Sequence, residues 1–91
     1  MEKFIKHQKK TQLKDFYLKY LTLCMAGEVG ELCNEIKKME RDDDNYITQS
    51  RMNKIKLELG DVLWYYIGIC RKLNIDINDI MDLNYNKLNK S

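Results

Sequence analysis

The sequence predicts an all-α protein. Three observations lead to this prediction: the 91 residues include no proline, no stretch alternates β-branched and polar residues, and apolar residues recur at helical spacing in two long segments. A chain of this length forms one small domain, residues 1–91, and its apolar fraction of 44% supports only a thin core. Long helices in so short a chain leave apolar faces uncovered, so we expect oligomerisation.

The first two of four expected helices occupy the N-terminal half. A short helix, weakly amphipathic, covers about 2–10. A long helix then runs from about Asp15, as its N-cap, to about Arg41. Its apolar residues repeat every seven positions, at Leu18, Met25, Leu32 and Met39.

A polar break separates this helix from a second long one. Residues 42–45, Asp-Asp-Asp-Asn, form the clearest loop of the chain. The third helix begins near Thr48 or Ser50, both good N-caps, and ends near Leu73. Its apolar stripe takes alternating steps of four and three residues, through Ile55, Leu59, Val62, Tyr66, Ile69 and Leu73.

The last helix is expected over about 77–90. Asn74 can close the third helix in a left-handed conformation, and Asp76 can cap the fourth. Both signals are local, so they fix where the chain turns between the two helices.

Composition indicates which partners and which cellular compartment to expect. Charge is nearly balanced, with 16 Lys and Arg against 14 Asp and Glu, so we expect neither a nucleic-acid partner nor a membrane surface. No apolar run could span a bilayer, and the first ten residues lack the apolar core of a signal peptide. Cys24, Cys33 and Cys70 lack metal-binding spacing and lie in apolar helical patterns. We therefore expect reduced core cysteines in a cytoplasmic protein.

Each long helix carries acidic residues beside its apolar stripe. At about 100° per residue, Glu28 and Glu31 share one flank of the second helix. Glu58 and Asp61 share one flank of the third. If the two helices pack antiparallel through their stripes, the four carboxylates converge, and their repulsion favours a bound cation. Oxygen ligands without His or Cys favour Mg²⁺, with Mn²⁺ as a substitute.

Glycines interrupt both acidic motifs. An acidic pair three residues apart is, by itself, most often a solvated helix face. Here Gly27, Gly30 and Gly60 stand beside the acids, although glycine inside a helix costs about 1 kcal/mol relative to alanine. The glycines therefore indicate a close approach of the helices or room for a ligand.

Three segments resemble one known family. Residues 23–38, LCMAGEVGELCNEIKK, are similar to the second helix of MazG-like nucleotide pyrophosphohydrolases. Residues 58–65, ELGDVLWY, are similar to their second metal motif, and residues 84–88, NYNKL, to their closing signature. Order and spacing agree over about 21–88.

This resemblance implies a four-helix MazG-like fold with two long antiparallel helices, completed by dimerisation, as a homodimer or homotetramer. It implies Mg²⁺-dependent hydrolysis of nucleoside triphosphates (NTP or dNTP) between the α- and β-phosphates, giving a monophosphate and pyrophosphate. By position, the family's metal ligands correspond to Glu28, Glu31, Glu58 and Asp61. The residues of its C-terminal signature that lie near the phosphates correspond to Asn84 and Lys87.

Several roles stay open at this level. Glu28 or Glu31 activates the attacking water, and the sequence does not decide which. Lys38 can bind phosphate or simply end a solvated helix. Trp64 or Tyr65 can stack on a base, although packing is their commoner role. Two departures from the family, Gly27 in place of a common acid and Ser91 in place of a common arginine, weaken the carry-over.

Two alternatives also remain. Phosphoribosyl-ATP pyrophosphohydrolases share the expected fold and the acidic helix pattern. A non-catalytic helical dimer that serves as an interaction module explains the apolar stripes, but it leaves the carboxylates beside them without a reason.

Overall fold

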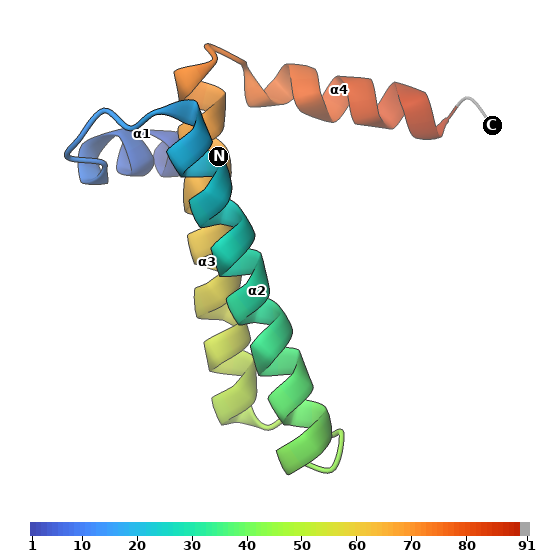
Figure 1. Cartoon of the computed structure of the whole chain (residues 1–91). Helices are drawn as coiled ribbons and strands as arrows, with labels where there is room; N and C mark the ends of the chain where they lie inside the picture. Colours follow the sequence, from blue (N-terminus) through green and yellow to red (C-terminus); the bar gives the residue numbers. More distant parts are fainter. Residues whose placement is uncertain (90–91) are drawn as a thin grey trace.

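The computed structural model describes residues 1–89, and they form four α-helices without a strand (Figure 1). The helices are α1 (Glu2–Thr11), α2 (Leu18–Asp42), α3 (Gln49–Lys72) and α4 (Ile77–Leu88). The predicted all-α class is confirmed. The expected end of the last helix at position 90 and the departure at Ser91 lie outside the described residues.

An antiparallel pair, α2 and α3, forms the body of the molecule (Figure 1). The short α1 packs across the C-terminal end of α3, whereas α4 projects away from the pair like an arm. No helix within residues 1–89 is long and apolar enough to cross a membrane.

Local capping signals place three of the helix ends. The Thr48 side chain accepts a hydrogen bond from the Arg51 backbone N–H at 3.1 Å and so caps α3. Asp76 caps α4 in the same way, by accepting from the Asn78 N–H at 2.9 Å. Asn74 has a φ of 54°, the left-handed conformation expected there.

The predicted start of α2 at Asp15 is wrong. The helix begins at Leu18, and its N-cap, Tyr17, contributes no side-chain hydrogen bond. Residues 12–17 are needed to turn the chain back from α1, and Asp15 lies in this linker. Its carboxylate contacts the Lys72 ammonium group at 3.2 Å instead of capping a helix.

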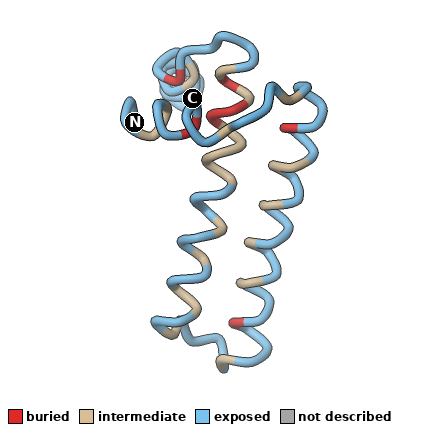
Figure 2. The backbone as a smooth tube through the Cα atoms, turned by 90° about the vertical axis from the view of Figure 1, so that its left-hand side faces the viewer, coloured by how far each residue is buried: buried red, intermediate tan, exposed pale blue. Residues whose placement is uncertain are grey.

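The core is thin and lies mostly where α1 crosses the pair (Figure 2). Among residues 1–89, the buried hydrophobic residues are Leu21, Met39, Ile67, Cys70 and Ile77. The apolar stripes predicted for α2 and α3 are only partly inside. Leu18 is 38% exposed, Leu59 50% and Leu73 48%. On α2, Met25 and Leu32 are half-buried and Met39 is buried, as predicted, and Leu21, outside the predicted stripe, is fully buried.

The cysteines divide three ways. Cys70 is buried as expected and Cys24 is half-buried, but Cys33 is exposed. The prediction that all three are core residues is therefore wrong for Cys33, because it lies on the outer face of α2, turned away from α3.

Candidate metal centre

Three carboxylates converge at the middle of the α2–α3 pair. Glu28 comes from α2, and Glu58 and Asp61 come from α3. One carboxylate oxygen of each lies within 4.8 Å of the others. Glu28 lies seven residues, two helical turns, after the buried Leu21, so it belongs to the α2 face that meets α3. Glu58 is half-buried there as well, while Asp61 is exposed at the rim. We call these three residues the acid cluster.

The acid cluster carries negative charge that the protein leaves uncompensated. Burial raises the pKa of Glu28 above its usual range, and the neighbouring carboxylates of Asp61, Glu58 and Glu31 raise it further. None of the ion pairs found within residues 1–89 includes a member of the cluster. Three oxygen donors without nitrogen or sulfur fit a hard divalent cation such as Mg²⁺.

Glu31 stands apart from the other predicted ligands. It is exposed, and its carboxylate is not among those within 4.8 Å of one another, although its charge contributes to the raised pKa of Glu28. The structure thus brings three of the four acids together and leaves the fourth about one turn along α2.

A second polar contact crosses the same pair of helices nearer the loop. Arg51 Nη1 donates to Glu35 Oε2 at 2.6 Å, and Arg51 Nε donates to Asp43 Oδ2 at 2.9 Å. The hydrogen bond from Arg51 lowers the pKa of Glu35. Sequence reasoning missed this ion-pair group, although a signal existed: Arg51 lies seven residues before Glu58, so the two share one face of α3.

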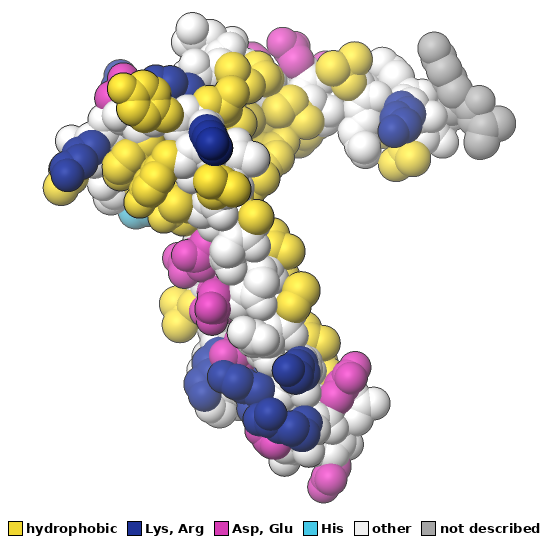
Figure 3. Space-filling model, viewed as in Figure 1, with side chains coloured by type: hydrophobic (Ala, Val, Ile, Leu, Met, Phe, Trp, Pro, Cys, Tyr) yellow, Lys and Arg dark blue, Asp and Glu magenta, His cyan; other side chains and the backbone are white. Residues whose placement is uncertain are grey.

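Lys38 also belongs to this end of the helices. Its ammonium group lies 4.0 Å from Glu35 Oε1, and its side chain is half-exposed. On the face shown in Figure 3, acidic side chains gather partway along the pair, and Lys and Arg side chains gather beyond them toward the loop. Positive charge therefore stands close to the acid cluster without pairing with it.

The glycines beside the acids do not serve a close helix approach within this chain. A Cβ built on Gly27, Gly30 or Gly60 meets nothing within 4 Å. The first of the two explanations offered by the sequence is therefore wrong for the single chain. What remains is open space over the helix surfaces that carry the acids.

An aromatic pocket of about 430 Å³ lies about one helical turn beyond the acid cluster on α3, because Trp64 and Tyr65, which line it, follow shortly after Asp61 in that helix. Tyr65 links the two, because it lines the pocket and its pKa, raised mainly by burial, is also raised by Glu28. Trp64 packs edge-on against Tyr65, with ring centroids 5.0 Å apart, and its indole N–H donates to Thr11 Oγ1 at 2.8 Å. The rest of the wall comes from Thr11 at the end of α1, from Tyr20 of α2 and from the linker between these helices: Gln12, Leu13, Lys14 and Phe16.

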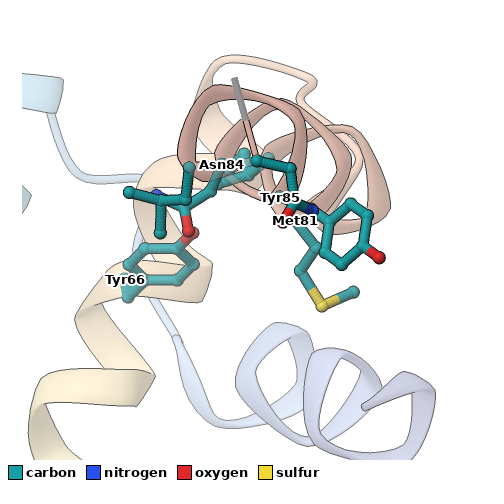
Figure 4. A pocket seen from close by; sticks show the side chains of 7 residues that line it. Tyr66, Met81, Asn84 and Tyr85 are labelled. Atoms are coloured by element: carbon teal, nitrogen blue, oxygen red, sulfur yellow. The ribbon is translucent and has the colours of Figure 1, made fainter. Parts of the chain in front are cut away.

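Asn84 and Lys87 lie on α4, which projects away from the acid cluster (Figure 1). Asn84 lines a separate open pocket of about 530 Å³ between α4 and Tyr66 of α3 (Figure 4). Tyr66 is five residues after Asp61, about 140° around the α3 axis. Within one chain, the structure does not bring the C-terminal signature to the acids.

Comparison with known proteins adds an independent result. Residues 16–91 match the family described as the MazG nucleotide pyrophosphohydrolase domain. The chain is also similar to a protein of Mycobacterium phage L5 named Gene 37 protein, with 39% identity over 71 residues. The matched region covers 78% of this chain but 62% of the phage protein, so the chain spans less than two-thirds of that relative. No solved structure matches this chain significantly.

Proposed function

The chain belongs to the MazG nucleotide pyrophosphohydrolase domain family, and we propose that it hydrolyses nucleoside triphosphates, NTP or dNTP, between the α- and β-phosphates. The products are a nucleoside monophosphate and pyrophosphate. The observation that carries the proposal is the acid cluster, in which Glu28, Glu58 and Asp61 meet without a basic partner.

Mg²⁺, with Mn²⁺ as a substitute, is the cation we assign to this cluster, with Glu28, Glu58 and Asp61 as ligands and Glu31 at its edge. When bound, the ion neutralises charge on the phosphate oxygens. The raised pKa of Glu28 supports this assignment, because a carboxylate surrounded by like charge gains most from a cation.

Glu31 is our choice for the residue that orients the attacking water and accepts its proton. The water must be held beside the metal by a carboxylate that is not itself committed to the metal. A carboxylate oxygen of Glu28 lies within 4.8 Å of oxygens of two other acids, whereas Glu31 lies one turn away and is exposed. A proton taken by Glu31 can pass directly to solvent.

The nucleotide extends from the acid cluster in two directions in this proposal. Its base enters the aromatic pocket, whose volume lies within the usual range for small-molecule sites and where Trp64 and Tyr65 offer rings for stacking. Its phosphates point toward Lys38, which follows Glu28 on α2 toward the loop and lies 4.0 Å from Glu35 Oε1.

A second copy of the chain completes the protein. Four large apolar residues of α4 are 50–70% exposed, namely Met81, Leu83, Tyr85 and Leu88, and α4 lies along no other helix of its own chain. A stable helix needs such a face covered. Assembly as a homodimer or homotetramer would also allow Asn84 and Lys87 to approach the phosphates held by another subunit.

The decisive experiment incubates the protein with single NTPs, single dNTPs and phosphoribosyl-ATP in the presence of Mg²⁺, and scores pyrophosphate against orthophosphate. We expect pyrophosphate from one or more free nucleotides. Orthophosphate alone would refute cleavage between the α- and β-phosphates. Turnover of phosphoribosyl-ATP only would assign the chain a different substrate, and no turnover of any compound would favour the non-catalytic helical dimer.

Assembly is tested separately by sedimentation. We expect the wild-type protein to sediment as a dimer or tetramer and Leu88→Glu, which places a charge on the exposed face of α4, to shift toward the monomer. A monomeric wild-type protein at micromolar concentration would contradict the assembly.

A further inference from the structure

The contact between α1 and α3 is built on a buried amide. Gln8, on α1, is fully buried, the only polar residue of the described chain that is. Burying an amide is unfavourable unless its hydrogen bonds are made. Here both ends are satisfied: Arg71 Nη1 donates to Gln8 Oε1 at 2.6 Å, and Gln8 Nε2 donates to Gln12 Oε1 at 2.7 Å.

The hydrogen bonds continue from Gln8 into the wall of the aromatic pocket. Gln12 Nε2 donates to the Lys14 backbone carbonyl at 2.9 Å. Gln12 and Lys14 both line the pocket, whereas Gln8 and Arg71 do not. A chain of three hydrogen bonds thus runs from α3, through α1, to the linker. We call it the Arg71–Lys14 relay.

Gly68 shows how closely the relay lies against α3. A Cβ at this position would stand 2.8 Å from Gln8 Nε2 and 3.3 Å from Gln12 Oε1, too close for either amide to stay in place. Of the four glycines, it alone has neighbours within 4 Å. A methyl group here would therefore displace the amide groups of Gln8 and Gln12 that form the relay.

An apolar contact could hold α1 against α3, but it would not fix the rotation of α1 about its axis, because hydrophobic attraction is not directional. Hydrogen bonds require both distance and angle. Since the linker follows directly from α1, the rotation of α1 decides where the pocket wall stands.

We propose that Gln8 and Arg71 are positioning residues for the nucleobase: they fix the linker wall of the aromatic pocket through the relay and thereby set which bases fit. This inference rests on the proposed function, because it assigns the base to that pocket. It concerns selection among nucleotides and leaves the acid cluster unaffected.

The test is Gln8→Met, which keeps the length and approximate volume of the side chain but removes both hydrogen bonds. We expect KM for the preferred nucleotide to rise about tenfold, because the pocket wall is no longer held in one position and must be ordered when the base binds. We expect kcat to change less than about twofold and the preference among the four bases to flatten. Inhibition by inorganic tripolyphosphate, which has no base, should stay unchanged.

Two further variants separate this role from general damage to α1. Lys9→Met alters the exposed neighbouring residue and should leave KM and base preference as in the wild type. Gly68→Ala displaces Gln8 from the opposite side while favouring the α3 helix itself, so it should reproduce the selective rise in KM. It keeps the proposal testable if Gln8→Met does not fold.

The outcomes are distinguishable. A wild-type protein that yields no pyrophosphate refutes the proposed function, and this inference with it. An active wild-type protein whose KM and base preference persist in Gln8→Met and Gly68→Ala refutes the relay alone. An equal loss of tripolyphosphate inhibition and nucleotide binding would also refute it, because the damage would then reach the acid cluster.

Discussion

Glu28 and Glu35 lie seven residues apart on the same face of α2, both half-buried against α3, yet their surroundings are opposite. Glu35 meets the Arg51 guanidinium, and its pKa is lowered. Glu28 meets two more carboxylates, and its pKa is raised. Equivalent helical positions thus serve different ends. The chain itself supplies the counter-charge in the ion-pair group, whereas the acid cluster lacks one and can take it from a cation.

The largest expected difference between the two regions is in catalysis. Glu58→Gln should lower the rate of pyrophosphate release by about 100-fold or more, because it removes a charged ligand from the acid cluster. The matched control, Glu35→Gln, makes the same chemical change in the ion-pair group, nearer the loop between α2 and α3. It should retain most of the activity. Similar losses in both variants would contradict the division of roles.

The ion-pair group should matter more for stability than for catalysis. Arg51→Met removes the guanidinium group that Glu35 and Asp43 contact and leaves Glu35 only the more distant Lys38, so we expect Tm to fall by about 5 °C or more. Arg41→Met, which removes an exposed pair with Asp42, should lower it by less than about 2 °C. Thermal melts of the metal-free protein measure both values. Equal shifts would show that the burial of the Arg51 contacts adds nothing.

Glu35 and Glu28 should make the stability of the protein depend on pH in opposite directions. The pKa of Glu35 is lowered in the folded protein, so its stabilising contribution is present above the unfolded value of about 4.3 and is lost as pH falls through the folded pKa. The pKa of Glu28 is raised, so its protonated form favours folding below about 4.3, and this contribution is lost as pH rises through the folded pKa.

Melts between pH 3 and pH 8 without metal would measure this contrast. At neutral pH, Glu28→Gln should be more stable than the wild type and Glu35→Gln less stable, and both differences should shrink toward pH 3. Mg²⁺ should raise the Tm of the wild type at pH 7 and have little effect on Glu28→Gln. A stabilising Glu28 side chain at neutral pH without metal would overturn the comparison.

The smallest expected effect is that of glycine-to-alanine substitutions on the free energy of unfolding. Three glycines stand beside the acid cluster and none beside the ion-pair group. Gly27→Ala meets no atom within 4 Å and should stabilise the protein by up to about 1 kcal/mol. Gly68→Ala, at a crowded position, should give no such gain. Denaturant melts would measure both, and a destabilised Gly27→Ala would show that a second chain occupies the space.

Local features of the fold were predictable from the sequence because their causes are local. Thr48 and Asp76 cap helices through atoms two or three residues away, and Asn74 takes its left-handed conformation at a helix end. The convergence of Glu28 with Glu58 and Asp61 followed from helical periodicity plus antiparallel packing. Their role as metal ligands stays a prediction.

The packing of the helices against one another depends on contacts that the spacing of residues in the sequence does not predict. α2 and α3 each carry more than one apolar face, and periodicity cannot say which meets its neighbour in the same chain. The half-exposed Leu59 and Leu73 belong to the face left outside. The docking of α1 on α3 depends on the hydrogen bond between Arg71 and Gln8, two residues 63 positions apart in the sequence.

The projecting α4 has a consequence for the life of the chain in the cell. The α2–α3 pair joins neighbouring segments and can close soon after synthesis, because its contacts span short stretches of sequence. By contrast, α4 follows this pair in the chain and exposes an apolar surface along which no other helix of residues 1–89 lies. If copies of the chain assemble through this surface as proposed, we expect a threshold of expression. Below it, α4 remains open to proteases, and above it α4 is covered by a second copy.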